Sequence, residues 1–234
     1  MSGKLYGIGA GPGDPELLTI KAINAIMKCG VVAVPETGNG ETTALSIIKK
    51  HIDGKDILKC RFAMEHDMAK RIESRKKAAG DIMRVLDSGT DVAFITLGDP
   101  TTYSTYMYVH ETIANRGYDT QIIPGISSYS AAAAALGIPL CEGGETLMIA
   151  AGHDESLDRL LDSPGNKVIM KSGASFMLVL EKLKERGYGS MTKIACRVTM
   201  EGQRLFASID EYEKSPEGGY FTIAIVKGAR ESGF

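Results

Sequence analysis

A carboxylate and a run of hydroxyl groups stand together in one short segment of the chain. Asp99 follows an apolar stretch, and the next residues carry the hydroxyls of Thr101, Thr102, Tyr103, Ser104 and Thr105. So many hydroxyl groups suit recognition of a polar small molecule better than packing in a core. Asp99 would also suit a cap on a following helix. The sequence leaves both roles open.

A second segment rich in glycine and proline follows an apolar strand near the N-terminus. Gly7, Gly9 and Gly11 allow the backbone to approach a ligand closely, and Asp14 before Pro15 has the pattern of a helix N-cap and first helical residue. A dinucleotide fingerprint G-x-G-x-x-G is disfavoured, because its third glycine is replaced by Pro12 or by Asp14 in the two possible registers. A P-loop is excluded too, because no Gly-Lys-Ser/Thr follows.

Three loops share one design, in which a strand leads through a Gly/Pro turn into a helix. We call Gly9 to Pro15 the first loop, Gly98 to Thr105 the second loop, and Pro124 to Ser130 the third loop. Ligands of open α/β sheets bind beyond the carboxyl ends of strands, so the three loops are expected to ring a cleft. The alternative is that each is only a tight connection. The third loop lacks a G-x-S-x-G elbow, which disfavours a nucleophilic serine.

Basic residues in or beside expected strands are candidates for binding the carboxylates of a substrate, because charge on a buried face is costly unless it meets an anion. The candidates are Lys59, Arg61, Lys171, Arg197 and Arg204. The net charge of −2 excludes a strong overall field for nucleic acid.

Metal binding, secretion and membrane insertion are all disfavoured. The four cysteines form no C-x-x-C pair and suit reduced core thiols, and His51, His66, His110 and His153 have no partner at metal-ligand spacing. No basic N-terminal region precedes a long apolar run, and no segment is apolar enough to span a bilayer. We expect a cytoplasmic enzyme without a metal site.

The first half of the chain alternates expected strands and helices, which is typical of a parallel α/β domain. Strands are expected over Lys4–Ile8, Val31–Val34, Asp91–Thr96 and Thr120–Ile123, with helices over Pro15–Lys28, Thr42–Lys50, Asp67–Leu86 and Thr101–Asn115. Within the first helix Leu17, Ile20, Ile23 and Met27 recur at helical spacing, which predicts a core face.

The second half predicts a smaller α+β domain with a mixed sheet. An alanine-rich helix, Ser128–Leu136, precedes strands over Leu147–Ala151, Lys167–Lys171, Lys193–Thr199, Arg204–Ser208 and Tyr220–Val226, and helices over Glu155–Leu161 and Ala174–Arg186. The last two strands are expected to form an antiparallel hairpin around residues 215–219. The domains are expected to cover residues 1–123 and 124–234.

Three motifs occur in the order Gly9-Ala10-Gly11-Pro12-Gly13-Asp14-Pro15-Glu16-Leu17-Leu18-Thr19, Gly98-Asp99-Pro100 and Pro124-Gly125-Ile126-Ser127-Ser128. They resemble the motifs of the tetrapyrrole (corrin/porphyrin) methylases, which follow in the same order, and the resemblance covers nearly the whole chain. The resemblance implies a two-domain α/β enzyme, a homodimer, and S-adenosylmethionine bound in a cleft between the domains. It also implies that S-adenosylhomocysteine leaves as product. The stretch Gly98 to Tyr106, the alanine-rich helix and Tyr220-Phe221-Thr222 are similar to the C20-methyltransferases of the cobalamin pathway.

Carried over position by position, the resemblance implies cofactor contacts at Pro12, Gly98, Asp99, Thr102, Ser127, Ser128 and Lys171. Ser127 departs from the family's frequent threonine, which is a mild change. The implied substrate is precorrin-2 or cobalt-factor II, and methyl transfer to its electron-rich carbon depends mainly on positioning. The sequence identifies no general base, and Tyr103, Tyr106 and Glu201 remain candidates.

Other functions stay open at this point. A related enzyme of the same fold could methylate a different corrin carbon, uroporphyrinogen III, or the diphthamide precursor on elongation factor 2, as a diphthine synthase does. A non-catalytic nucleotide-sensing module would bind the cofactor without a tetrapyrrole. The run Tyr103-Ser104-Thr105 favours the C20 enzyme, and tetrapyrrole binding would separate the enzymes from the sensor.

Overall fold

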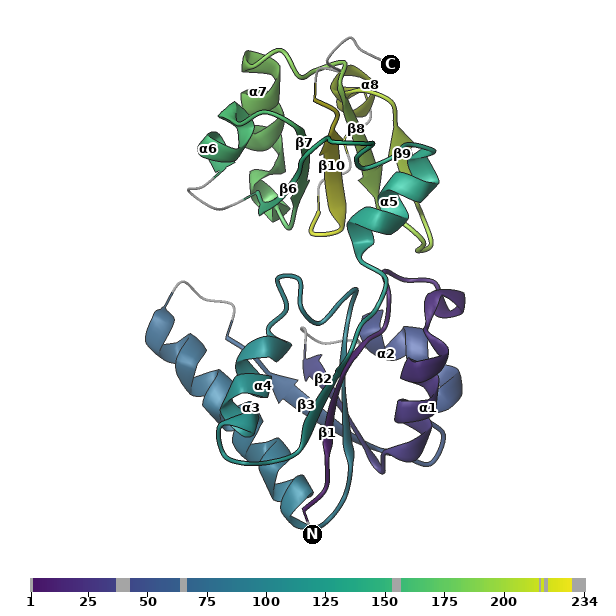
Figure 1. The fold of residues 1–234 in the computed structure, drawn as a ribbon, viewed down its shortest axis with the longest axis vertical. Helices are drawn as coiled ribbons and strands as arrows, with labels where there is room; N and C mark the ends of the chain where they lie inside the picture. Colours follow the sequence, from purple (N-terminus) through teal and green to yellow (C-terminus); the bar gives the residue numbers. More distant parts are fainter. Residues whose placement is uncertain are drawn as a thin grey trace. The chain divides into compact units, whose positions relative to one another are not determined.

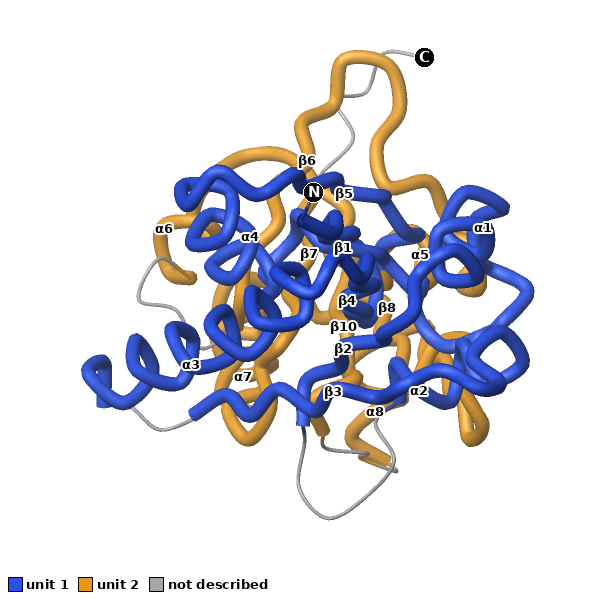
Figure 2. Tube along the Cα trace, turned by 90° about the horizontal axis from the view of Figure 1, so that it is seen from below, with its two compact units in different colours: residues 1–127 blue, residues 128–234 orange. Residues whose placement is uncertain are grey.

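The fold is seen in a computed structural model of the chain, which describes residues 2–36, 43–63, 67–152, 157–214, 216 and 219–228. The chain divides into two compact units, unit 1 with residues 1–127 and unit 2 with residues 128–234 (Figure 2). The domain boundary expected from the sequence, after Ile123, falls at the last residue of a strand and stays a prediction. Thr42, His66, His153 and Glu155 lie outside the described residues.

Unit 1 is built on a five-stranded sheet in which every strand pair is parallel. Its strands are β1 (Leu5–Gly9), β2 (Val31–Glu36), β3 (Asp56–Arg61), β4 (Val92–Thr96) and β5 (Thr120–Ile123). The spatial order is β3-β2-β4-β1-β5. β1, the central member of the β4-β1-β5 group, is buried along its whole length, as expected for a parallel sheet that is covered on both faces.

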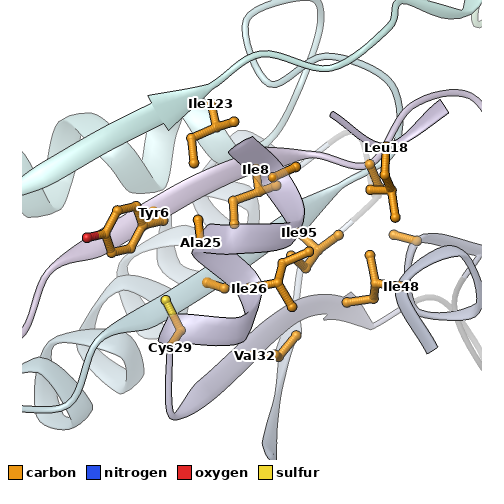
Figure 3. Packing of buried hydrophobic residues seen from close by; sticks show 14 of the residues in the cluster. Tyr6, Ile8, Leu18, Ala25, Ile26, Cys29, Val32, Ile48, Ile95 and Ile123 are labelled. Carbon is orange, nitrogen blue, oxygen red and sulfur yellow. The ribbon is translucent and has the colours of Figure 1, made fainter. Parts of the chain in front are cut away.

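Helices cover both faces of this sheet (Figure 1). On one face lie α1 (Ile20–Lys28) and α2 (Thr43–Ile48), and on the other lie α3 (Met68–Asp87) and α4 (Tyr106–Ala114). Figure 3 shows Ile26 of α1 and Ile48 of α2 packed with Ile8 of β1 in the first of these cores. The sheet thereby presents the carboxyl ends of β4, β1 and β5 side by side, with their loops following.

The predicted helix over residues 15–28 is interrupted. Pro15–Leu17 form a single 3-10 turn capped by Asp14, and α1 begins afresh at Ile20 with the Thr19 hydroxyl accepting from the Ala22 amide at 3.1 Å. The N-cap prediction for Asp14 is therefore confirmed, but for a short turn. The predicted core face is wrong for two of its four residues, because Ile20 and Met27 are 78% and 62% exposed. Ile20 and Met27 lie seven residues apart on one side of the continuous helix α1, and the buried face consists instead of Ala22, Ala25 and Ile26.

Unit 2 contains a mixed five-stranded sheet. Its strands are β6 (Leu147–Ala151), β7 (Asn166–Met170), β8 (Thr192–Cys196), β9 (Arg204–Phe206) and β10 (Thr222–Val226), in the order β6-β7-β10-β8-β9. The β6–β7 pair is parallel, and the pairs β7–β10, β10–β8 and β8–β9 are antiparallel. α6 (Leu157–Asp162), α7 (Phe176–Glu185) and α8 (Ile209–Glu213) share one core with the sheet, and α5 (Ser128–Leu136) packs against β8 and β10.

Two predictions about strands need correction. The predicted hairpin between the last two strands is wrong, because β10 inserts between β7 and β8 while β9 pairs with β8. The helix α8 separates β9 from β10, so the connection is too long for a hairpin turn. The sequence reasoning also missed β3, although Leu58, Lys59, Cys60 and Arg61 alternate apolar and polar as strand residues do.

The fold class predicted from the sequence is confirmed, with one parallel α/β unit and one unit containing a mixed sheet. No helix among the described residues is long and apolar enough to cross a membrane.

Candidate functional site

The first and second loops are joined by their backbones at the carboxyl ends of β1 and β4. The Gly11 amide donates to the Gly98 carbonyl at 3.2 Å, and the Gly98 amide donates to the Gly11 carbonyl at 2.7 Å. Both glycines have left-handed backbones, with φ of 76° and 72°, which an L-residue adopts only at a cost. The Ala10 amide adds a bond of 2.9 Å to the Thr96 carbonyl. The two loops therefore form one connected surface.

The Asp99 carboxylate joins the second loop to the third. One carboxylate oxygen accepts the Gly125 amide at 3.0 Å, and the other accepts the Thr101 amide at 2.8 Å and the Thr101 hydroxyl. Asp99 does not cap α4, whose N-cap residue is Thr105. The turn that Asp99 holds also explains why α4 begins at Tyr106, five residues later than the sequence predicted. Asp99 is thus fixed in orientation by two loops.

Close backbone packing completes what we call the loop junction, formed by Gly9, Gly11, Gly98, Asp99 and Gly125. A Cβ atom added to Gly9 would lie 2.5 Å from the Gly125 nitrogen and 2.6 Å from the Gly98 oxygen. A Cβ added to Gly98, by contrast, would meet nothing within 4 Å. Gly9 and Gly125 are therefore needed for contact between the loops, whereas a Cβ at Gly98 would touch no other part of the protein.

A second contact holds the far end of the second loop. The hydroxyls of Thr96 and Ser104 lie 3.0 Å apart, and Ser104 Oγ also accepts the Tyr106 amide at 3.2 Å. Thr96 is the last residue of β4 and is buried, so this bond anchors the loop to the sheet just before α4. Sequence reasoning did not assign this role to Thr96, because the partner is known only once the loop folds back.

Five of the seven predicted cofactor residues lie in unit 1, on the three loops that its structure brings together. They are Pro12, Gly98, Asp99, Thr102 and Ser127, of which Pro12 and Gly98 are buried. Ser128 begins α5 and Lys171 follows β7, both in unit 2. The cofactor role of all seven residues stays a prediction.

Three of the five candidate cations lie at one end of the unit 2 sheet. β7 and β8 both run antiparallel to β10, so their carboxyl ends lie at the same end of the sheet. Lys171 comes directly after β7 and Arg197 directly after β8. Arg204 begins β9 opposite Cys196 at the same end. Lys171 and Arg197 both have left-handed backbones, with φ of 55° and 51°. The Arg197 guanidinium donates to the Glu201 carbonyl at 3.0 Å.

The reasoning that selected Lys59 and Arg61 was wrong in its premise. Both residues lie on β3, the edge strand of the unit 1 sheet, and both are exposed rather than set on a buried face. Arg61 Nε pairs with Glu36 Oε2 at 2.9 Å. Because water solvates these exposed side chains, their charge is not costly and requires no bound anion to offset it.

The candidates for a general base are separated by their surroundings. Tyr106 is fully buried, its hydroxyl lies 3.0 Å from His110 Nδ1, and burial raises the pKa of its phenol above the ordinary value. Its ring also covers Gly7, where an added Cβ would lie 1.9 Å from Tyr106 Cζ. Tyr106 is therefore a packing residue. Tyr103 and Glu201 are exposed.

The cysteines and histidines show no metal centre among the described residues. Burial raises the pKa of the Cys29 and Cys60 thiols to about 12, so these thiols stay protonated in the core. Cys196 is also buried, while Cys141 is exposed.

The comparisons with known proteins agree with this geometry. The family model of the Tetrapyrrole (Corrin/Porphyrin) Methylases matches residues 4–212. A probable cobalt-precorrin-2 C(20)-methyltransferase of Methanocaldococcus jannaschii is 35% identical over 96% of both chains. A precorrin-2 C(20)-methyltransferase of a Sinorhizobium species is 29% identical, over 98% of this chain and 97% of that protein.

Among solved structures, a cobalt precorrin-4 methyltransferase is similar in fold, with a TM-score of 0.77, 22% identity and coverage of 96% of this chain and 94% of that one. The fold and the loop junction define an α/β protein in which three loops meet beyond the strand ends. The chain belongs to the tetrapyrrole methylase family.

Proposed function

We propose that the protein is an S-adenosylmethionine-dependent methyltransferase that acts on C20 of precorrin-2 or of its cobalt complex, cobalt-factor II, in cobalamin biosynthesis. The observation that carries a cofactor site is the loop junction, where Asp99 links the second and third loops and Gly11 pairs with Gly98. The choice of reaction is supported by similarity to C20-methyltransferases over nearly the whole chain.

The loop residues suit an adenosyl cofactor in chemistry and in space. A Cβ added to Gly98 would meet nothing within 4 Å, so protein atoms leave room for a ligand beside this α-carbon. Asp99 offers an oriented carboxylate to hydroxyl or amino groups, and Thr102 and Ser127 stand on the same loops with further hydroxyls. We propose that Pro12, Gly98, Asp99, Thr102 and Ser127 contact the cofactor, and that Ser128 and Lys171 of unit 2 add to them.

When bound, S-adenosylmethionine supplies a methyl group that its sulfonium has already activated. The protein's contribution is therefore orientation, which can supply most of the acceleration when two reactants must be aligned. Asp99 accepts hydrogen bonds, and the bonds to Gly125 and Thr101 keep its carboxylate from turning. The Thr96–Ser104 bond keeps the second loop from moving away from the sheet.

Substrate carboxylates are proposed to meet the basic end of the unit 2 sheet. Arg197 and Arg204 stand at the end of β8 and the start of β9, and Arg204 lies over the Phe206 ring at 4.9 Å. Arginine forms paired hydrogen bonds with carboxylates, so these two residues fit the many carboxylate side chains of a tetrapyrrole. Lys59, Arg61 and Arg197 are all exposed, but Lys59 and Arg61 lie on β3 of unit 1 and not at this end of the unit 2 sheet.

The experiment that tests this function has two parts. Calorimetry with S-adenosylhomocysteine should show binding, and incubation with S-adenosylmethionine and either metal-free or cobalt-loaded precorrin-2 should add one methyl group by mass. Absence of S-adenosylhomocysteine binding to folded protein would refute an enzyme of this kind. Binding without transfer to either substrate, but with transfer to uroporphyrinogen III or a protein, would assign another reaction of the family.

We also propose a cytoplasmic homodimer, on the basis of the family resemblance alone. Light scattering should give twice the chain mass of 25.1 kDa. A monomer mass at all concentrations would contradict the dimer.

A further inference from the structure

Tyr103 occupies the middle of the second loop with a backbone that tyrosine rarely adopts. Its φ is 49°, in the left-handed region where glycine and asparagine are favoured over other residues. Its side chain is 48% exposed, so full burial of the ring does not offset this cost. Strain of this kind persists where neighbouring structure imposes it, and it gathers at ligand sites.

The neighbouring structure fixes Tyr103 from both sides. Before it, the Asp99 side chain holds the Thr101 amide, and the Thr102 amide reaches the Asp99 carbonyl at 3.4 Å. After it, Ser104 is bonded to Thr96 and to the Tyr106 amide. Hydrogen bonds therefore hold the loop at Asp99, four residues before Tyr103, and at Ser104, one residue after it. The backbone at Tyr103 is thus held on both sides, while its side chain stays about half exposed.

We propose that Tyr103 is a specificity residue whose ring covers one face of the tetrapyrrole. This inference rests on the proposed function and adds a contact to the same site. A tetrapyrrole is a broad conjugated ring with polar groups at its rim, and an aromatic side chain pairs with such a surface by offset stacking. Because the backbone at Tyr103 is already held by these bonds, little backbone conformational entropy is lost when substrate binds.

The proposal separates Tyr103 from the cofactor residues of the same loop. Gly98, Asp99 and Thr102 are proposed to bind S-adenosylmethionine, whereas Tyr103 contacts the methyl acceptor. Loss of the ring should therefore raise the KM for tetrapyrrole and leave the Kd for S-adenosylhomocysteine unchanged, as expected for a lost ground-state contact with one ligand.

Two substitutions separate the ring from the backbone. Tyr103→Asn keeps a residue that tolerates the left-handed backbone but removes the ring, and Tyr103→Phe keeps the ring and removes the hydroxyl. Tyr108→Ala is the matched control, because Tyr108 is also 48% exposed but lies on α4, where it stacks on Arg75. The measurements are KM for precorrin-2, Kd for S-adenosylhomocysteine and the thermal midpoint of each variant.

We expect Tyr103→Asn to raise the KM for tetrapyrrole about tenfold, with the Kd for S-adenosylhomocysteine within about twofold and a thermal midpoint no lower than that of the wild type. Tyr103→Phe and Tyr108→Ala should keep the wild-type KM. An unchanged KM in Tyr103→Asn would overturn the proposal, and so would an equal loss in Tyr103→Phe, which would assign the effect to the hydroxyl. A lowered midpoint with weaker S-adenosylhomocysteine binding would show a structural role instead. Failure of the wild-type protein to methylate any tetrapyrrole would overturn the proposed function, and this inference with it.

Discussion

Gly125→Ala tests whether the loop junction is as tightly packed as its distances indicate. A Cβ atom at residue 125 would lie 2.3 Å from the Gly98 oxygen and 2.8 Å from both Gly9 Cα and Gly9 C, all backbone atoms. Real Cβ contacts essentially never fall below 3.0 Å, so the loops would have to separate by at least 0.7 Å at the Gly98 oxygen. Overpacking of this kind costs about 1–3 kcal/mol. The same shift would displace the Gly125 amide from Asp99.

The matched control is the same substitution at Gly80. That residue lies inside α3, where an added Cβ meets nothing within 4 Å. Replacing glycine by alanine in a helix interior stabilises a protein by about 0.5–1 kcal/mol. Thermal unfolding followed by circular dichroism should therefore show a midpoint lower by roughly 2–12 °C in Gly125→Ala and higher by about 1–4 °C in Gly80→Ala.

Calorimetry with S-adenosylhomocysteine completes this test. Affinity should fall in Gly125→Ala, because the displaced amide no longer holds the Asp99 carboxylate in its orientation, and should stay unchanged in Gly80→Ala. Wild-type stability and wild-type affinity in Gly125→Ala would refute the close packing of the loop junction.

Three further results are expected. Asp99→Asn should weaken S-adenosylhomocysteine binding about tenfold or more while the protein stays folded, because one carboxylate oxygen becomes a donor; a lower thermal midpoint with unchanged affinity would mean that Asp99 only ties the loops together. Arg204→Glu should raise the KM for tetrapyrrole and leave cofactor affinity unchanged, and an equal loss in both would argue against a substrate contact. Hydrogen bonds from Asn166, then from Lys227 and the Glu142 amide, lower the pKa of Glu145 to about 2. The stability that this carboxylate contributes is therefore complete above its unfolded pKa near 4.5 and is lost as pH falls toward 2. Denaturant unfolding of the wild type and of Glu145→Gln should thus differ most above pH 5 and converge toward pH 2, and a gap that is constant with pH would contradict this cause.

The sequence predicted the layers of the fold because local signals determine them. Apolar runs ending in glycine and proline loops indicate buried parallel strands, and β5 and α5 have the predicted bounds. The insertion of β10 between β7 and β8 was missed, because pairing between strands distant in sequence leaves no local pattern. The start of α4 was misplaced for a related reason. The Asp99 carboxylate holds the Thr101 amide in a turn before the helix, and its other oxygen accepts the amide of Gly125, 26 residues away.

The candidate site was predictable to a similar degree. The three loops could be identified from glycine, proline and hydroxyl content, and their position beyond neighbouring strands follows from the parallel sheet. Their individual bonds, such as Thr96 to Ser104, depend on tertiary packing. The exposure of Lys59 and Arg61 could not be foreseen either, since β3 becomes an edge strand only through the order of the sheet.

The most direct test of the central claim is the position of the transferred methyl group. Precorrin-2, in the metal form that the protein accepts, is incubated with S-adenosylmethionine labelled with carbon-13 in its methyl group, and the product is examined by NMR. The proposed function predicts a single labelled methyl group on C20. A label on any other ring carbon, or transfer only to uroporphyrinogen III or to a protein, would contradict it.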